Sequence, residues 1–382
     1  MANSSHRTLR AAFAALLLLP AYSLAADSGA RWLDVEFPRD SPVLPVTSNL
    51  GLTTARVLGA SMVLDLHASL LLRNTGTKPI SGLTLRVEAQ DITPSGTGSV
   101  TVPSLRIEPG EVFPVSINME LSRPFSAASE GAIVQVSLDC ALFSDLTSYG
   151  PDKLQSRRAL MVYELQARRD RRYLAALLDA GKLAQLREEL NFGLQDITPQ
   201  QLGLELLHAP RPNEEREQPL NVGTVSFPSS PVRAIGGAAQ VAGSEIRSPE
   251  VEVRNTSQKT VRSIDMGWII RDEKGRDYVA GSVPAALELQ PVQTGKMTEK
   301  GTLRFTHLTG QPMSIGALLA FVSYVEFADG KLWIPSRVDI EQATHDPILR
   351  RALASSPEQQ RLSEIYRRKG MSGLSQELRK GN

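Results

Sequence analysis

The stretch from Val251 to Gly275 decides the fold, and it reads VEVRNTSQKTVRSIDMGWIIRDEKG. Apolar and polar side chains alternate at both of its ends, at Val251 and Val253 and again at Ile264, Met266, Trp268 and Ile270. Alternation with a period of two is typical of a strand with one buried face. The polar residues 255–259 separate the two runs and predict a turn. The stretch therefore predicts two consecutive antiparallel strands, with Trp268 on the core side.

A second stretch repeats this pattern earlier in the chain. Residues 70–91 read LLLRNTGTKPISGLTLRVEAQD, and Asn74 lies 181 positions before Asn255 (255 − 74). A further pair of matching segments precedes each stretch, VEFP at 35–38 and VSFP at 225–228. About seven short segments of this kind, punctuated by Gly, Pro and Asn, are typical of an immunoglobulin-like antiparallel sandwich. We predict two duplicated β-sandwiches, at residues 26–165 and 222–345.

Each predicted sandwich is followed by a segment with helical spacing of its leucines. In residues 166–208 the apolar residues recur on both sides of Gly181, and in residues 346–382 on both sides of Gly370. Such spacing, interrupted by a glycine that ends one helix, predicts a short helical hairpin in each tail. Ser356, just before Pro357, is a suitable residue to begin the second tail. We expect each tail to pack on the sandwich that it follows, or on a partner.

The two remaining segments predict export and a linker. Residues 1–25 contain Arg7 and Arg10, then an apolar run at 11–19 that is too short to span a membrane, then small residues at a cleavage site. This order is typical of a signal peptide and predicts a secreted or periplasmic protein. Residues 209–221 are rich in proline and charge and predict a linker between the copies. No later apolar run has the length of a membrane span.

Composition limits the classes of function. The 382 residues carry a net charge of +1, which argues against nucleic acid as a partner. Cys140 is the only cysteine, so no disulfide forms within the chain, and its apolar surroundings predict a buried thiol. The sequence lacks the motifs of metalloproteases, P-loops, dinucleotide-binding folds and serine hydrolases. We assign no catalytic, cofactor-binding or metal-binding residue. An enzyme with a site between the domains is the alternative.

Three groups of polar residues have both a structural and a functional interpretation. Arg168, Arg169, Arg171 and Arg172 predict a solvated helix face, with an anionic surface as the alternative partner. Asn255-Thr256-Ser257 is a glycosylation sequon, but the matching Asn74 lies in no sequon, which favours a turn role with left-handed backbone. Glu326 and Asp329 are explained by a solvated strand end and a turn rather than a cation site. A glycan-binding module is disfavoured by an aromatic content of 5%.

From Val251 to Gly275 the chain resembles the FxLYD-type extracytoplasmic modules. The resemblance rests on residues that include Asn255, Thr256, Asp272 and Gly275, followed by Pro291. The chain departs from that pattern at 268–272, which read WIIRD and lack the tyrosine. The resemblance implies an exported β-sandwich with no established enzymatic role. We therefore expect a non-catalytic binding or structural protein that acts through protein–protein contacts.

Overall fold

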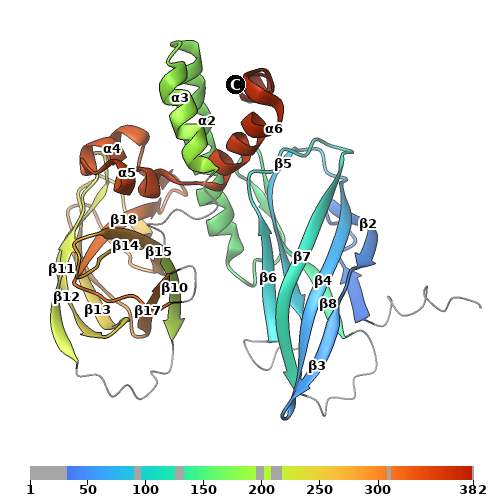
Figure 1. The fold of residues 1–382 in the computed structure, drawn as a ribbon, viewed down its shortest axis with the longest axis horizontal. Helices are drawn as coiled ribbons and strands as arrows, with labels where there is room; N and C mark the ends of the chain where they lie inside the picture. The colour runs from blue at the N-terminus through green and yellow to red at the C-terminus, as the bar shows by residue number, and fades with distance from the viewer. Residues whose placement is uncertain are drawn as a thin grey trace, which may run out of the picture.

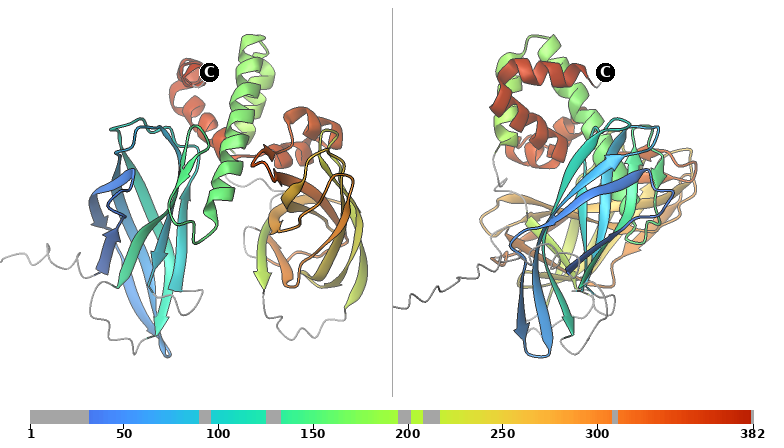
Figure 2. Two further views of the ribbon diagram at one scale, coloured as in Figure 1. Left: turned by 180° about the vertical axis from the view of Figure 1, so that it is seen from behind. Right: turned by 90° about the vertical axis from the view of Figure 1, so that its right-hand side faces the viewer.

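The computed structural model describes residues 32–89, 96–124, 133–194, 202–207, 217–307 and 311–380. Two β-sandwiches lie side by side, and a long helix, α2 (Ser156–Asp179), passes between them (Figures 1 and 2). The remaining helices gather at one end of this pair. The predicted class, mainly β with two sandwiches and helical tails, is confirmed. The predicted signal peptide lies outside the described residues.

The first sandwich consists of two sheets. One has the strand order β1-β8-β5-β6 with β9 added to β8, and in the other β4 pairs with β2, β3 and β7. The strands are β1 (Leu33–Glu36), β2 (Val43–Leu50), β3 (Thr54–Leu58), β4 (Ser61–Asn74), β5 (Ile80–Glu88), β6 (Thr97–Val102), β7 (Val112–Pro124), β8 (Val134–Phe143) and β9 (Ser148–Tyr149).

The second sandwich repeats the strand order of one sheet of the first. The order β11-β18-β14-β15 matches β1-β8-β5-β6, and β11 is parallel to β18 as β1 is to β8. It differs in that β11 also pairs with β12, which joins both sheets into one. In addition, β10 pairs with β17, and β13 pairs with both β16 and β17 where β4 pairs along that edge with β7 alone. The strands are β10 (Leu202–Leu207), β11 (Gln218–Thr224), β12 (Val232–Ala242), β13 (Glu245–Asn255), β14 (Val261–Arg271), β15 (Asp277–Ala285), β16 (Thr294–Thr298), β17 (Thr302–His307), β18 (Ala317–Phe327) and β19 (Leu332–Trp333).

The matching asparagines show how closely the copies agree. Both side chains are fully buried. The amide nitrogen of Asn74 donates to the carbonyl oxygens of Lys78 and Ile107, each at 3.0 Å, and that of Asn255 donates to those of Lys259 (2.8 Å) and Leu289 (3.1 Å). The carbonyl oxygens of Ile107 and Leu289 also accept from the backbone nitrogens of Ile80 and Val261, so each asparagine ties its turn to an existing backbone pair. The asparagines therefore pin a turn in each sandwich.

This arrangement corrects one detail of the predicted turn. Neither asparagine is among the described residues that have a positive φ, so the left-handed backbone expected there is not found. In both copies the asparagine side chain donates equivalent hydrogen bonds instead. Because the Asn255 amide is buried and donates to three carbonyls, it is not available for a glycan.

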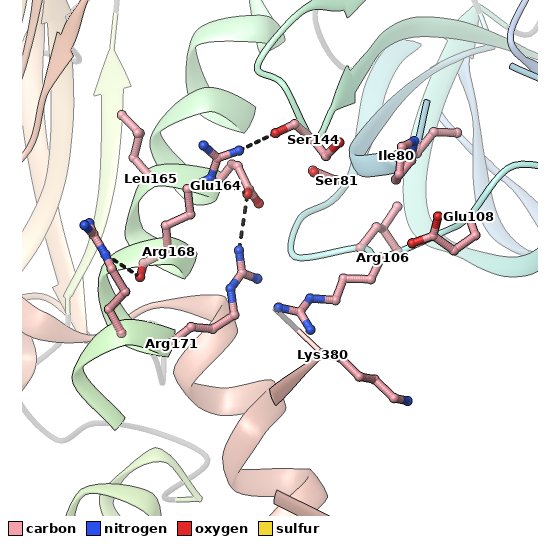
Figure 3. Close-up of a pocket in the computed structure, with 13 residues that line it drawn as sticks. Ile80, Ser81, Arg106, Glu108, Ser144, Glu164, Leu165, Arg168, Arg171 and Lys380 are labelled. Carbon is pink, nitrogen blue, oxygen red and sulfur yellow. Dashed lines mark hydrogen bonds and ion pairs between the residues drawn. The ribbon is translucent and has the colours of Figure 1, made fainter. Parts of the chain in front are cut away.

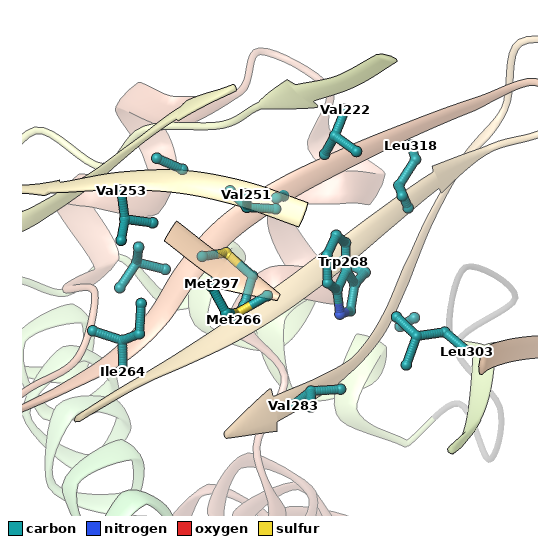
Figure 4. Packing of buried hydrophobic residues seen from close by; sticks show 14 of the residues in the cluster. Val222, Val251, Val253, Ile264, Met266, Trp268, Val283, Met297, Leu303 and Leu318 are labelled. Carbon is teal, nitrogen blue, oxygen red and sulfur yellow. The ribbon is translucent and has the colours of Figure 1, made fainter. Parts of the chain in front are cut away.

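Each sandwich encloses its own apolar core. Trp268 is fully buried in the second core, on the same strand as Ile264 and Met266 (Figure 4). The predicted core position of Trp268 is confirmed. Its indole nitrogen has no hydrogen-bond partner within the described part of the chain, so the ring contributes through packing alone.

The helical tails contain more helices than predicted. The helices after α2 are α3 (Leu183–Gly193), α4 (Arg337–Ala343), α5 (Pro347–Ala354) and α6 (Pro357–Arg379). Gly181 separates α2 from α3 with a φ of +67°, and Gly370 kinks α6 with a φ of +64°. Ser356 caps α6, because its hydroxyl accepts from the backbone nitrogen of Gln359 at 3.2 Å. The predicted glycine breaks and the serine cap are confirmed.

The expected docking of each tail on its own sandwich is wrong for most of the tail. The two tails pack on each other, in a separate cluster formed by Leu174, Leu177, Leu186, Leu190, Leu362, Leu374 and Leu378. Leu174 and Leu362, Leu186 and Leu374, and Leu190 and Leu378 are each 188 positions apart. The narrow apolar stripe of the first tail therefore packs against the equivalent stripe of the second tail. We call α2, α3 and α6 the helical unit.

Other parts of the tails contact the sandwiches. The first half of α2 places Leu160 on Cys140 and Leu142 of β8, whereas α4 and α5 cover the second sandwich through Ile340 and Leu349. Among the described residues, no helix is both long and apolar enough to cross a membrane.

The segment boundaries differ from those predicted. Helix α2 begins at Ser156, ahead of the boundary at residue 165, because its first turns are amphipathic and rest on β8. Strand β10 lies within the predicted first tail but pairs with β17 of the second sandwich. Strand β11 begins at Gln218, inside the predicted linker, and α4 begins before the predicted end of the second sandwich.

Candidate binding cleft

A cleft of about 680 Å³ opens where the first sandwich meets the helical unit (Figure 3). Its walls come from segments that are far apart in the sequence: the start of β5, the loop before β7, the residue after β8, one face of α2 and the end of α6. We call it the cationic cleft, after its charged lining residues Arg106, Glu108, Glu164, Arg168, Arg171, Arg172 and Lys380.

Helix α2 supplies the largest share of this lining. Glu164, Arg168 and Arg171 lie four and seven positions apart and therefore on one helix face. The Glu164 carboxylate accepts from Arg168 Nε at 2.8 Å and from Arg171 Nη2 at 3.2 Å. Arg168 also donates to the carbonyl oxygen of Ser144. These bonds hold both guanidinium groups at the wall of the cleft.

The loop before β7 and the end of α6 add positive charge. Arg106 precedes β7 and points toward Arg171 across the cleft (Figure 3). Burial and the neighbouring Arg171 guanidinium lower the pKa of Arg106. Lys380 follows the end of α6, and Arg172 is exposed on α2. Five cationic and two acidic residues line the cleft, an excess of three positive charges.

Beside the cleft lies a buried ion-pair network that corrects the predicted solvated face. Asp170 is fully buried, pairs with Arg169 at 2.9 Å and Arg337 at 2.8 Å, and accepts from the hydroxyl of Ser356. Although burial opposes its ionisation, these arginines hold the pKa of Asp170 below its usual range. Arg169 and Arg171 are also buried. Of the four predicted residues, only Arg168 and Arg172 keep substantial contact with solvent.

The network joins the two tails. Arg171 pairs with Glu358 of α6 at 3.2 Å, and Arg169 donates to the carbonyl oxygens of Ala354 (2.8 Å) and Pro335 (3.3 Å). Arg106 of the first sandwich lies 3.7 Å from the Glu377 carboxylate of α6. The geometry of the cleft therefore depends on contacts between the first copy and the tail of the second.

The other residues considered in the sequence lie away from the cleft. Asp329 pairs with Lys259 at 2.6 Å in a turn, as predicted, but Glu326 is buried and accepts from the Ser263 hydroxyl, so it is not a solvated strand end. Cys140 is buried, and burial raises the pKa of its thiol to about 12. The described part of the chain contains no group of three or more His, Cys, Asp or Glu residues that could hold a metal ion.

A second charged junction connects α2 to the second sandwich. Arg158 lies 3.5 Å from Glu326 and 3.9 Å from Asp265, which are on β18 and β14. Burial raises the pKa of Asp265 to about 6. The Arg158 charge lowers this pKa and the Glu326 charge raises it, and both effects are smaller than that of burial. The folded protein therefore binds this proton more tightly than the unfolded chain does.

We predict a pH-dependent effect of Asp265→Asn. Because the folded-state pKa is raised, the charged carboxylate destabilises the fold at pH 8, and this penalty fades as the pH falls through 6 toward 4. The stabilisation by Asp265→Asn should be about 2 kcal/mol larger at pH 8 than at pH 4.5. Urea unfolding of both proteins at the two pH values measures this difference, and an equal effect at both would contradict it.

The cleft is lined by groups that recognise anions. None of its thirteen described lining residues is a histidine or a cysteine, and its charge comes from guanidinium and ammonium groups. Such groups recognise carboxylates and phosphates through charge-assisted hydrogen bonds. The sequence pointed to Arg168 and Arg172 through their clustering. Arg106 and Lys380 carry no local signal, because only the fold brings them to α2.

Comparisons with known proteins give no family. No protein-family model matches this chain, and no curated protein sequence matches it. Among solved structures, a β-glucosidase from Kluyveromyces marxianus is similar at a TM-score of 0.16 and 10% identity, over 72% of this chain and 44% of that chain. A likeness at this level carries no argument about fold or activity. The resemblance to FxLYD-type modules stays a prediction.

Proposed function

We propose that this is an exported, non-catalytic binding protein that acts through protein–protein contacts at the cationic cleft. The observation that carries the proposal is the convergence of five cationic side chains from three segments around one hollow of about 680 Å³. Glu164, Glu358 and Glu377 already pair with four of these cations, so an anionic partner is attracted by the excess of positive charge that remains. A carboxylate cluster on a partner protein supplies that anion.

The support for a protein partner is the size and shape of the surroundings. The cleft opens between a sandwich and a helical unit, so a partner that inserts an acidic segment also contacts both walls. Apolar side chains, Ile80, Leu105 and Leu165, alternate with the charges along these walls. A free inorganic anion would leave them uncovered. An enzyme with a site between the domains is the other candidate, but no observation favours it.

Charge reversal at the exposed rim tests the proposal. Arg172 and Lys380 are exposed, so Arg172→Glu with Lys380→Glu should leave the fold intact. We expect the double variant to lose at least about tenfold in partner affinity, because two favourable charges become repulsive. The measurement is quantitative capture of exported proteins on the purified chain, followed by titration of the captured partner at two salt concentrations.

A matched double variant provides the control. Lys274→Glu with Lys300→Glu reverses the same number of exposed charges on the second sandwich, outside the cleft. It should bind the partner as the wild type does. Equal loss in both double variants would show that net charge matters rather than the cleft, and no loss in either would contradict the proposal.

A further inference from the structure

A second surface carries unbalanced charge, on the side of the second sandwich formed by β12 and β13 (Figure 1). Arg233 of β12 and Arg254 of β13 stand directly opposite each other in the strand register. Both are exposed, and neither has an ion-pair partner within the described part of the chain. Like charges placed directly opposite on neighbouring strands destabilise a sheet. The sandwich itself gains nothing from this pair.

A strained residue lies beside the two arginines. Val292 has a φ of +64° and is 56% exposed. A β-branched side chain in the left-handed region is strained, and such strain is concentrated at functional sites. Ile235, the extra residue of a β-bulge in β12, is 53% exposed on the same surface. Together these residues border a hollow of about 500 Å³. We call Arg233, Arg254, Ile235 and Val292 the arginine patch.

The first copy shows that the fold does not require this chemistry. Its equivalent turn has the same hydrogen bonds, from Glu111 to Glu108 and from Asn74 to Glu111, where the second copy bonds Gln293 to Gln290 and Asn255 to Gln293. The residue in the place of Val292 is Gly110, with a φ of +85°, which glycine adopts without strain. In the place of the arginine pair, Leu44 stands opposite Arg73. The patch is therefore an addition of the second copy.

We propose that the arginine patch binds an acidic, partly apolar peptide segment of a partner protein. A carboxylate between the two guanidinium groups removes their repulsion and accepts charge-assisted hydrogen bonds. A neighbouring apolar side chain of the same segment covers Val292 and Ile235. A free phosphate would leave these two apolar side chains in water. This second site is independent of the cationic cleft.

The test uses the full chain and three fluorescein-labelled hexapeptides in which leucine alternates with glutamate, glutamine or lysine. Fluorescence anisotropy should show preference for the glutamate peptide. Arg233→Gln with Arg254→Gln should weaken its binding about tenfold and abolish the preference for glutamate over glutamine. The first-copy variant Arg73→Gln is the matched control and should bind as the wild type does.

The Val292→Gly variant tests whether the strained Val292 side chain contributes to peptide binding. This variant should melt about 2 °C higher, because the strain is relieved, and yet bind the glutamate peptide about threefold more weakly, because the apolar contact is lost. A higher melting temperature with unchanged affinity would overturn the role of Val292.

Several other results would overturn the proposal. The first is a wild-type chain without preference for the glutamate peptide. The second is peptide binding that survives in the double arginine variant but is lost in Arg172→Glu with Lys380→Glu. The third is binding of anionic lipid vesicles in place of the peptide. Dimerisation that is lost in the double arginine variant would assign the patch to a second copy of this chain instead. Loss of partner capture at the cleft leaves this proposal unaffected, because its variants are different.

Discussion

Replacing Trp268 with alanine is expected to lower the free energy of unfolding of the second sandwich by ~3–5 kcal/mol. Trp268 is the largest of the fully buried side chains, and it lies in the centre of the second core with Met266 and Leu318 nearby (Figure 4). Its removal takes away the transfer free energy of the ring and leaves a cavity that close-packed neighbours fill only in part. Urea unfolding of the full chain, followed by circular dichroism, measures the change.

Trp268→Phe is the matched variant. It keeps an aromatic ring and removes an indole N–H group that has no partner within the described residues, so it should cost clearly less than Trp268→Ala. A loss below about 1 kcal/mol for Trp268→Ala would mean that the ring is not part of the core.

Replacing Asp170 with asparagine should destabilise the folded chain by ~3–5 kcal/mol. Asp170 is the common acceptor of Arg169, Arg337 and Ser356, which come from α2, α4 and the start of α6. Without its charge, the buried Arg169 guanidinium loses its counterion and the partly buried Arg337 keeps Glu189 at 3.6 Å. Removing one partner of a buried ion pair leaves an uncompensated charge. The variant should unfold at a lower urea concentration, and α6 should lose protection from hydrogen exchange.

Asp179→Asn on the same helix is the control, because Asp179 is exposed at the end of α2. Its effect should stay within about 0.5 kcal/mol. Similar, small effects of both substitutions would show that the network is replaceable by water and would contradict its role in joining the tails.

The sequence predicted those features that arise from local pattern. Alternation around Val251 and Trp268 identified strands and a core residue, and the spacing of 181 positions identified two copies with the same strand order. The glycine breaks at Gly181 and Gly370 and the cap at Ser356 were also visible, because backbone geometry at these points is determined by the residue itself.

Features that depend on distant contacts were missed. The arginines at 168–172 look alike in sequence, yet Arg169 and Arg171 are buried because α5 and α6 bring acceptors to them. The apolar stripes of the tails predicted that one face of each helix is buried, but they did not identify the surface that buries it. The cationic cleft needs Arg106 and Lys380, which are 274 positions apart and meet only when the second tail returns to the first sandwich.

The central claim is that the tails of the two copies pack on each other and so build the cleft. Hydrogen–deuterium exchange of the full chain, compared with a chain that ends at Ser355, tests it most directly. Leu186 and Leu190 of α3 are fully buried against α6, and a helix of 11 residues is marginal on its own. We predict that the amides of α3 and the second half of α2 exchange at least about tenfold faster in the shortened chain, while those of β4 and β7 do not change. Unchanged protection of α3 would contradict the claim.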